Sequence, residues 1–425
     1  MLKVLLRNKK IIEPFNESAR ELSVQNMPLW SLQRDQLANF CDREIQVDST
    51  AELPATSEER LVLADNIFFD REFITAFIAK AKSGAIPVQA AISSKDAAFR
   101  EHILPLSTSF TVHEEVYLAP IWYYPAGNSS TPVPMVVDLQ AKEVGYYNVP
   151  PYMAGKMGDL VYQLPGRALI AIDSWVHLFI ADIIFSLFAR GVRFEQRLKK
   201  DLGYKLALVG AAILQGKQLL RSNGVVSVGS NCTIDPSAII NGPTSIGDNV
   251  TIGAGVVIEN SIIGNNVNIS QGSQVMLSVV GNGTFLPFNS AVFMTTLMDN
   301  SIVAQNACLQ MCVIGRNTFI GAGTTFTDFN LLPIPIRAVN GEGNLAPSNR
   351  PVLGSAVGHN CRIGSGLVIY PGRMIGSDVV LIGSDERRVI KKNIYHAQSD
   401  AHKTRYPDVY KPRYQEGSDD ERSEW

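Results

Sequence analysis

Two aspartates in the first half of the chain each follow a hydrophobic run that is typical of a buried strand. The runs are Leu61–Ala64 before Asp65 and Leu169–Ile172 before Asp173. A carboxylate at the carboxyl end of a buried strand lies where α/β folds bind their ligands. Two such carboxylates could together coordinate a Mg²⁺ ion that bridges phosphate groups. The alternative is that each aspartate only caps a helix that follows it.

A second polar cluster lies between these two aspartates. His113, Glu114 and Glu115 come directly before a hydrophobic segment at Val116–Ala119. Glu114 and Glu115 could line a sugar-binding pocket, since carboxylates accept hydrogen bonds from hydroxyl groups. The alternative is the solvated end of a strand, where charged residues usually lie.

The elements that must position these groups fall into two parts, and the second part is a repeat of six residues. An aliphatic residue followed by glycine recurs along 224–384, for example at Val228/Gly229, Ile246/Gly247, Ile252/Gly253, Ile314/Gly315, Ile320/Gly321 and Ile363/Gly364. A period of six fits neither an α-helix nor an isolated strand. It fits a prism-shaped coil, in which each rung is one short strand and one turn, with the aliphatic side chain inside and glycine or asparagine at the corner.

These rungs resemble the hexapeptide repeat of left-handed parallel β-helices. The pattern becomes irregular over 276–310, where Met and Phe residues interrupt it, so we expect a distorted coil there. The segment Asp328–Asn349 is rich in proline, asparagine and glycine. We expect this segment to leave the coil as an exposed loop.

Strands and helices alternate in the first part of the chain, which indicates an α/β layer. The expected strands are Lys3–Leu6, Leu61–Leu63, Val116–Tyr124 and Ala168–Ile172, and the expected helices are Ser31–Cys41 and Arg71–Ala81. Two more helices, His177–Arg190 and Phe194–Arg221, should bridge the two parts. From Tyr395 onward the chain is polar and charged, and we expect this tail not to fold by itself.

An α/β domain followed by a hexapeptide coil is similar to the sugar-1-phosphate nucleotidylyltransferases, including the bifunctional members whose coil is an acyltransferase. The resemblance rests on the strands that end at Asp65 and Asp173. It implies a Rossmann-like nucleotidyltransferase domain in which these two carboxylates hold a catalytic Mg²⁺. It also implies that the substrates are a nucleotide and a sugar phosphate.

The N-terminal segment departs from the pattern of this family. The family has a Gly-rich loop that cradles phosphates, whereas Asn8–Leu22 contains no glycine. Lys9, Lys10 and Arg20 are the residues that could bind phosphates in its place. A side chain does not restore the close backbone approach that glycine allows. A non-catalytic protein that binds sugar nucleotides or scaffolds partners is therefore an alternative.

The coil contains a second candidate site. Gly321–Asn330 resembles the rung of the acyltransferases that leads into a loop beside the acyl-CoA and sugar pocket. The resemblance implies acetyl-CoA as a cosubstrate and places Asp328 and Asn330 near a bound substrate. These acyltransferases use a histidine as general base, because imidazole titrates near neutral pH. His359 is the only histidine within 224–392, so it is the candidate base, and a structural corner residue is the alternative.

Composition and charge exclude several classes of partner. The 38 Lys and Arg residues against 40 Asp and Glu residues give a net charge of −2, so we expect no nucleic-acid partner. The apolar stretch 168–189 contains Asp173, His177 and Asp182, which argues against a membrane span, and we expect no membrane partner. The five cysteines are scattered, and we expect them to be reduced in a cytoplasmic protein.

These observations predict a nucleotidyltransferase-like α/β domain over 1–175, a helical bridge over 176–223, a left-handed β-helix over 224–392 and a polar tail over 393–425. The favoured function is Mg²⁺-dependent nucleotidyl transfer to a sugar 1-phosphate with release of pyrophosphate. Acyl transfer from acetyl-CoA to a sugar nucleotide at the coil is the second hypothesis. Apolar residues expected on the coil faces predict a homotrimer, and these are Val256, Val257, Met276 and Phe293.

Overall fold

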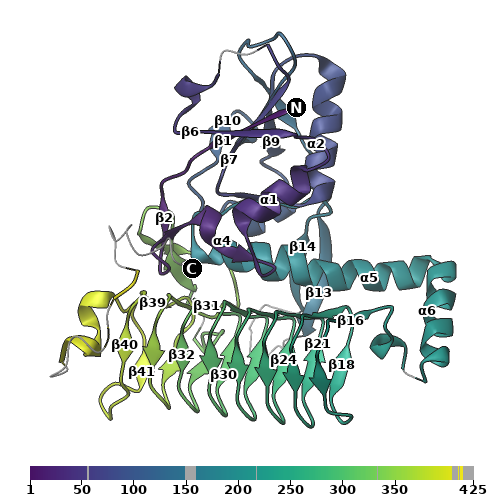
Figure 1. Ribbon diagram of the computed structural model, residues 1–425. Coiled ribbons are helices and arrows are strands. Elements are labelled where there is room, and N and C mark those ends of the chain that lie inside the picture. The colour runs from purple at the N-terminus through teal and green to yellow at the C-terminus, as the bar shows by residue number, and fades with distance from the viewer. Residues whose placement is uncertain are drawn as a thin grey trace. The chain divides into compact units, whose positions relative to one another are not determined.

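The computed structural model describes residues 1–54, 57–148, 159–216, 218–332, 334–403, 410 and 412–414 (Figure 1). The chain divides into two compact units. The first unit contains Met1–Ile12, Glu17–Ala181 and Leu331–Arg350, and the second contains Glu13–Asn16, Asp182–Asn330 and Pro351–Trp425. Neither unit is therefore a continuous piece of the sequence.

A mixed sheet forms the core of the first unit. Its strands lie in the order β12, β9, β11, β7, β1, β6, and β10 pairs with β11. The bounds are β1 (Leu2–Leu6), β6 (Arg43–Val47), β7 (Arg60–Ala64), β9 (Val88–Ser93), β10 (Thr111–His113), β11 (Val116–Tyr124) and β12 (Val133–Val136). β1 pairs in parallel with both β6 and β7, whereas β11 pairs antiparallel with both β7 and β9. The strand predicted over Val116–Tyr124 is confirmed with the same bounds.

Helices and small sheets complete this unit. The helices are α1 (Leu29–Leu37) and α2 (Arg71–Gly84), and the small sheets pair β2 (Ile11–Ile12) with β3 (Glu17–Ser18), β4 (Ser23–Val24) with β5 (Met27–Pro28), β8 (Ile67–Phe69) with β15 (Leu169–Ala171), and β13 (Lys142–Asn148) with β14 (Asp159–Leu164). In α2, Phe73, Phe77 and Ala81 are buried at a spacing of four residues, so one face of the helix packs into the core.

The bridge helices differ from those that we expected. A helical run passes from α4 (Trp175–Phe179) through a π-helical stretch (Ile180–Phe188) into α5 (Ala189–Lys200), and α6 spans Leu202–Leu214. The single helix predicted over Phe194–Arg221 is therefore wrong. It breaks at Asp201, which has extended backbone angles and whose carboxylate accepts a hydrogen bond from the Tyr204 amide at 2.9 Å.

One helix in the described part of the chain, Trp175–Lys200, is long and apolar enough to cross a membrane by length and composition alone, and 78% of its most apolar stretch is buried. The carboxylate of Asp182 on this helix accepts a hydrogen bond from the Thr296 hydroxyl at 2.6 Å, and both residues are buried. A buried acid with a polar partner is typical of a helix that packs in a protein core.

The second unit is a coil of three parallel eight-stranded sheets. The first sheet contains β16 (Val226–Val228), β19 (Thr244–Ile246), β22 (Ile262–Ile263), β25 (Val279–Val280), β28 (Thr296–Leu297), β31 (Val313–Ile314), β36 (Ala356–Val357) and β39 (Met374–Ile375). The second contains β17 (Thr233–Ile234), β20 (Thr251–Ile252), β23 (Asn268–Ile269), β26 (Phe285–Leu286), β29 (Ile302–Val303), β32 (Phe319–Ile320), β37 (Arg362–Ile363) and β40 (Val380–Leu381). The third contains β18 (Ile239–Asn241), β21 (Val257–Glu259), β24 (Gln274–Met276), β27 (Ala291–Phe293), β30 (Cys308–Gln310), β33 (Thr325–Phe326), β38 (Val368–Ile369) and β41 (Val389–Ile390). This arrangement fits a left-handed β-helix built from hexapeptide repeats.

The coil is regular over 276–310, where the sequence predicted a distortion. Its first turn spans 18 residues, from Val226 to its partner Thr244, whereas several later turns span 17. The shorter turns shift the six-residue pattern without disturbing the strand pairing, and Val279 remains in register with Thr296. The expected distortion is therefore wrong, because one residue fewer per turn changes only a corner.

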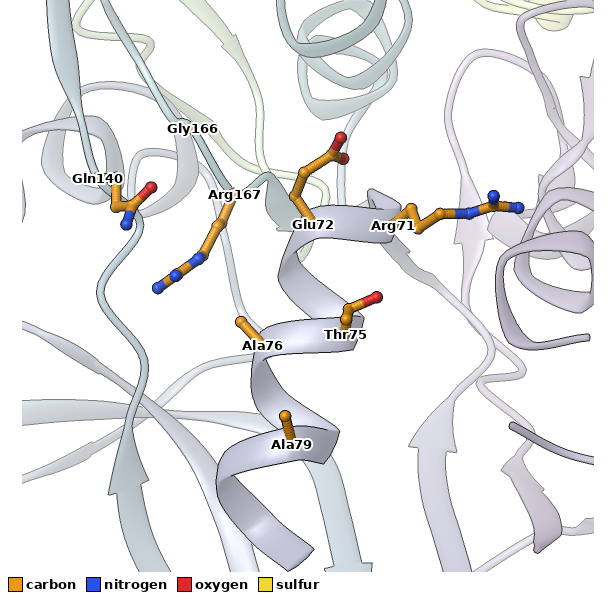
Figure 2. A pocket seen from close by; sticks show the side chains of 8 residues that line it. All are labelled: Arg71, Glu72, Thr75, Ala76, Ala79, Gln140, Gly166 and Arg167. Carbon is orange, nitrogen blue, oxygen red and sulfur yellow. The ribbon is translucent and has the colours of Figure 1, made fainter. Parts of the chain in front are cut away.

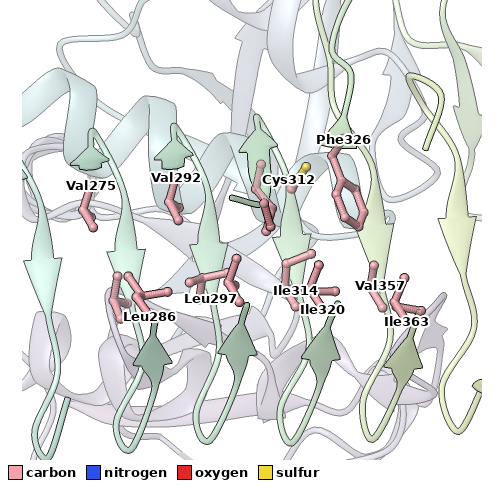
Figure 3. Close-up of a cluster of buried hydrophobic side chains, with 14 of the residues drawn as sticks. Val275, Leu286, Val292, Leu297, Cys312, Ile314, Ile320, Phe326, Val357 and Ile363 are labelled. Carbon is pink, nitrogen blue, oxygen red and sulfur yellow. The ribbon is translucent and has the colours of Figure 1, made fainter. Parts of the chain in front are cut away.

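Aliphatic side chains fill the axis of the coil. Figure 3 shows Leu286 of the second sheet and Leu297 and Ile314 of the first sheet pointing into this interior, and all three are fully buried. Val256, which the sequence placed on an outer face, also lies in the interior and is fully buried. It cannot contribute to a contact between subunits, whereas Met276 and Phe293 are half-buried on the third sheet.

One corner of the coil repeats a left-handed backbone conformation. The non-glycine residues with positive φ there are Asn231, Asn249, Asn266, Asn300, Asn317, Asn360 and Asp378. Asparagine and aspartate enter this region at a lower cost than other residues with a side chain. The sequence-based expectation of asparagine at the corners is confirmed.

The segment expected to be an exposed loop instead contributes a hairpin to the first unit. The hairpin consists of β34 (Arg337–Val339) and β35 (Leu345–Pro347). Ala338 is fully buried and Arg350 is 6% exposed, whereas Leu331 is 89% exposed. The segment leaves the coil as expected and many of its described residues are exposed, but it is not a simple loop, because Ile336, Ala338 and Val339 give the hairpin a buried face.

Part of the polar tail packs on the coil. The Tyr414 amide donates to the Asp378 carboxylate at 2.7 Å, and the Tyr414 ring lies 4.7 Å from the His359 ring. The Tyr414 carbonyl accepts a hydrogen bond from the Asn16 amide group at 2.7 Å. This segment is therefore anchored, which the sequence-based expectation for the tail did not include.

We predict that Tyr414→Ala lowers the free energy of unfolding by about 2–3 kcal/mol, because it removes a buried ring from its packing. The measurement is urea denaturation of the full chain. Phe288→Ala is the control, since Phe288 is 43% exposed on the coil, and it should cost less than about 1 kcal/mol. Equal stability of Tyr414→Ala and the wild type would contradict the packing role.

Candidate functional site

The strand order of the first unit reverses at β1. The chain leaves β1 for β6 on one side, and β7 lies on its other side, both parallel to it. Ligands bind open α/β sheets at such a reversal of strand order. Asp65 directly follows β7, and Arg7 and Asn8 directly follow β1. The sequence-predicted position of Asp65 at a ligand-binding edge is thus what the strand order supports.

Asp65 is buried beside a cation. One of its carboxylate oxygens accepts the Asn8 amide at 2.9 Å, and the other lies 3.9 Å from a guanidinium nitrogen of Arg20. Burial raises the pKa of Asp65, and the Asn8 amide and the charge of Arg20 oppose this rise. The structure thus brings together two of the residues that the sequence singled out.

Asp173 has a different environment, which is rich in hydrogen-bond donors. Its carboxylate accepts hydrogen bonds from the Ser107 hydroxyl, from the Thr108 and Ser109 amides, from the Ser109 hydroxyl and from the Asn66 side chain, at distances of 2.6–3.2 Å. Burial alone would raise the pKa of this carboxyl group. Hydrogen bonds from the surrounding hydroxyl and amide donors outweigh burial and lower the pKa overall.

His177 supports Asp173 and was not recognised from the sequence as a site residue. Its Nδ1 accepts the Asp173 amide at 3.2 Å, and its Nε2 lies 2.8 Å from the Pro105 carbonyl. A neutral ring with its proton on Nε2 satisfies both contacts. Complete burial lowers the pKa of His177, which favours this neutral form.

Neither aspartate caps a helix, so that alternative is wrong for both. Asp65 leads into strand β8 rather than a helix, and the residue that caps α2 is Asp70, which accepts the Phe73 amide at 2.8 Å. The residue that caps α4 is Ser174. The sequence placed the aspartates correctly at strand ends but did not separate them from the capping residues that follow.

The two carboxylates do not fit a shared Mg²⁺ site in this arrangement. Both oxygens of Asp173 already accept hydrogen bonds, and Arg20 supplies a positive charge next to Asp65. Within the part of the chain that the structure describes, no group of three His, Cys, Asp or Glu side chains could hold a metal ion.

The β34–β35 hairpin packs against the segments that surround Asp173. The Ser174 hydroxyl donates to the Val339 carbonyl at 2.6 Å, and the Gly341 amide donates to the Leu106 carbonyl at 3.2 Å. A Cβ atom at Gly341 would lie 2.6 Å from the Lys10 ammonium nitrogen and 3.1 Å from the Asp173 Cβ. Glycine therefore allows the hairpin to approach the carboxylate closely.

The remaining sequence-predicted residues of the first unit lie apart from Asp65. Lys10 donates to the Thr108 hydroxyl at 2.8 Å on the Asp173 side, whereas Lys9 forms an exposed ion pair with Asp48 at 2.9 Å. Glu114 and Glu115 are exposed in the tight turn between β10 and β11. This is the solvated strand end that we considered as the alternative to a sugar pocket.

His359 occupies a structural column at one corner of the coil. In this column, a side chain accepts the backbone amide of the residue one turn earlier, and the acceptors include Asp248, Asn265, Asn282 and Asp299. Nδ1 of His359 makes the same contact with the Arg316 amide at 2.8 Å. The ring is fully buried, and Phe15 lies 5.2 Å from it. These contacts favour the structural alternative for His359.

Asp328 is a polar residue of the coil that lies just before the insert, Leu331–Arg350. Its backbone carbonyl accepts the Leu353 amide at 2.8 Å, which closes the base of the insert. With the Gln310 amide group oriented so that its nitrogen faces the carboxylate, the two side chains form a hydrogen bond of 2.9 Å. Burial raises the pKa of Asp328. The sequence named Asp328 and the neighbouring Asn330, but gave no signal for Gln310.

A surface hollow on the first unit contains none of the predicted site residues. It lies along α2 and is lined by Arg71, Glu72, Thr75, Ala76, Ala79, Gln140, Gly166 and Arg167 (Figure 2). Figure 2 shows the Arg71 side chain pointing away from Arg167 and Gln140. The two guanidinium groups therefore do not converge on a common ligand.

Comparisons with known proteins concern the coil. Residues 226–260 match the family model described as bacterial transferase hexapeptide (six repeats). A solved UDP-N-acetylglucosamine acyltransferase from Campylobacter jejuni is 14% identical, with a TM-score of 0.27, over 40% of this chain and 64% of that chain. A Bacillus cereus protein described as an acetyltransferase is 17% identical, with a TM-score of 0.18, over 37% of this chain and 75% of that chain. No curated protein matches.

We predict that Asp173→Asn lowers the free energy of unfolding by about 2 kcal/mol or more, because hydrogen bonds to a charged acceptor are lost. Asp65→Asn should be neutral or stabilising, because it removes a carboxylate whose charged form is disfavoured by burial, as its raised pKa indicates. Urea denaturation at pH 7 measures both. The stabilising contribution of Asp173 is present above its ordinary pKa of 3.8 and is lost as pH falls towards the lower folded value. Equal effects of the two variants at pH 7 would contradict this assignment.

We predict that His359→Asn is tolerated better than His359→Ala by about 1–2 kcal/mol, because asparagine supplies the acceptor that this corner needs. Asn265 and Asn282 already fill equivalent corners. Stability and any acetyl-CoA-dependent turnover are measured on the same samples. A loss of turnover by a factor of about 100 in a stable His359→Asn variant would show a general base instead.

Proposed function

We propose that the protein transfers a nucleotidyl group to a sugar 1-phosphate in its first unit. The observation that carries this proposal is the reversal of strand order at β1, beside which Asp65 lies 3.9 Å from Arg20. The resemblance of the strands before Asp65 and Asp173 to those of the nucleotidylyltransferases supports the same conclusion.

The side chain of Arg20 suits a phosphate ligand. The Arg20 side chain is 15% exposed, and its guanidinium group lies 3.1 Å from Glu21 and 3.9 Å from Asp65. A guanidinium binds two phosphate oxygens at once and neutralises negative charge that accumulates during transfer. Glu21, Gln46 and Asp65 surround this cation. Arg20 thus performs the electrostatic part of the role that a Gly-rich loop has in the similar family.

Acyl transfer from acetyl-CoA to a sugar nucleotide at the coil is the second candidate function. It is supported by the match of 226–260 to a transferase family and by the position of Asp328. The raised pKa of Asp328 brings this carboxyl group closer to neutral pH, where a carboxylate accepts a proton more readily from a sugar hydroxyl or amine. In this proposal Asp328, rather than His359, is the base.

The homotrimer remains part of this proposal. Met276 and Phe293 occupy neighbouring strands of the third sheet, where a flat face of the coil could meet a second copy. Burial of such apolar side chains around a threefold axis closes the assembly. The oligomeric state in solution tests this statement independently of any activity.

We predict that Arg20→Gln weakens binding of nucleoside triphosphates or sugar nucleotides by at least about tenfold, because a charge-assisted hydrogen bond to phosphate is lost. Isothermal titration with a panel of these ligands, together with release of pyrophosphate from a triphosphate and a sugar 1-phosphate, measures the effect. Arg34→Gln is the matched control, since Arg34 is exposed on α1.

Other outcomes assign the function differently. Equal ligand binding by Arg20→Gln and Arg34→Gln would show that Arg20 does not bind the phosphate groups of the ligand. Acetyl-CoA-dependent transfer that survives Arg20→Gln and is lost in Asp328→Asn would place the chemistry at the coil. Tight binding of a sugar nucleotide without either reaction would support the non-catalytic alternative.

A further inference from the structure

Helix α6 of the second unit has two faces, and only one of them is packed. Leu208 is buried in a cluster with Val225 and Val226 at the first rung of the coil. On the other face, Leu202 is 69% exposed and Leu206 is 61% exposed. Helix α6 thus buries one apolar face and exposes another.

The exposed residues form a stripe together with the half-buried Val209. Leu202, Leu206, Val209 and Ile213 are spaced by four, three and four residues, which places them on one side of an α-helix. Ile213 is 74% exposed, and Leu214 at the end of the helix is 89% exposed. A stripe of this size on the surface is typical of an interaction site.

Positive charge gathers beside the stripe. Lys199, Lys200 and Lys205 line one surface hollow together with Leu202 and with the acidic Glu195. The segment 189–205 contains six basic and two acidic residues, whereas the whole chain has a net charge of −2. The apolar stripe therefore lies next to a local excess of positive charge.

We propose that this surface docks on a lipid bilayer that carries anionic headgroups. We call the surface the α6 face and define it by Lys199, Lys200, Leu202, Lys205, Leu206 and Ile213. An apolar stripe with lysines along its side is the pattern of helices that lie in the membrane interface. The leucines and the isoleucine enter the boundary between headgroups and acyl chains, and the lysines contact the phosphates.

Charge favours an anionic membrane over a second copy of the chain as the partner of the α6 face. Two copies that meet through this stripe would bring two sets of lysines near each other, and like charges repel. An anionic membrane instead attracts them, and each lysine near such a surface adds to the binding. The docking is peripheral, so it revises the expectation of no membrane partner without adding a membrane span.

The test is flotation of the full chain with lipid vesicles at about 0.1 M salt, where charge attraction near a surface is only partly screened. One set of vesicles contains phosphatidylcholine alone, and the other contains phosphatidylcholine with phosphatidylglycerol. We expect binding to the anionic vesicles, at least about tenfold weaker in Leu206→Glu/Ile213→Glu and in Lys199→Glu/Lys200→Glu. Leu331→Glu is the control, since Leu331 is 89% exposed in the first unit, and it should bind like the wild type.

Three results would overturn the proposal. The first is equal flotation with both kinds of vesicle, or none with either. The second is binding that both double variants retain in full. The third is a smaller assembly of Leu206→Glu/Ile213→Glu than of the wild type in sedimentation without lipid, which would show that the stripe joins two copies. None of these readouts depends on the transfer reaction, so they leave the proposed function to its own test.

Discussion

The coil depends on one geometric constraint, which is that the chain must return to the same corner after every turn. A left-handed residue at that corner makes this return possible, and asparagine supplies it at Asn249, Asn266 and Asn300. The preceding residue then ties adjacent turns together, because its side chain accepts a backbone amide from the turn before it. The corner needs an acceptor of the right reach rather than one residue type. This is why His359 can serve in a column of amides and acids.

The same constraint allows a long insertion between two strands of the coil. Val313 pairs with Ala356 as neighbouring strands of one sheet, although the insert lies between them in the sequence. Because the pairing continues without a break, the insert does not have to contribute to the coil. It folds instead as the β34–β35 hairpin of the first unit, where Arg350 lies 3.0 Å from the His102 ring nitrogen Nδ1. The surroundings of Asp173 are thus built in part from residues far along the chain.

The two aspartates of the first unit show how environment separates similar sequence positions. Both follow a buried strand and both are almost fully buried. Asp173 is surrounded by backbone amides and hydroxyl groups that stabilise its charge, so its pKa falls. Asp65 has one amide partner and a cation at 3.9 Å, and burial dominates, so its pKa rises. A carboxylate that is satisfied by its own chain stabilises the fold, whereas one that is less satisfied remains available to a ligand or a neighbouring cation.

The sequence by itself determined the features that repeat or that lie within one strand. The six-residue period identified the coil, and the hydrophobic runs before Asp65 and Asp173 located two strand ends, because side-chain periodicity follows directly from local backbone geometry. Other features required contacts between distant residues. Examples are the donors around Asp173, the column that contains His359, the pairing of Gln310 with Asp328, and the hairpin of β34 and β35. Only the tertiary structure decided them, because the sequence does not show which distant donor will reach a given hydrogen-bond acceptor.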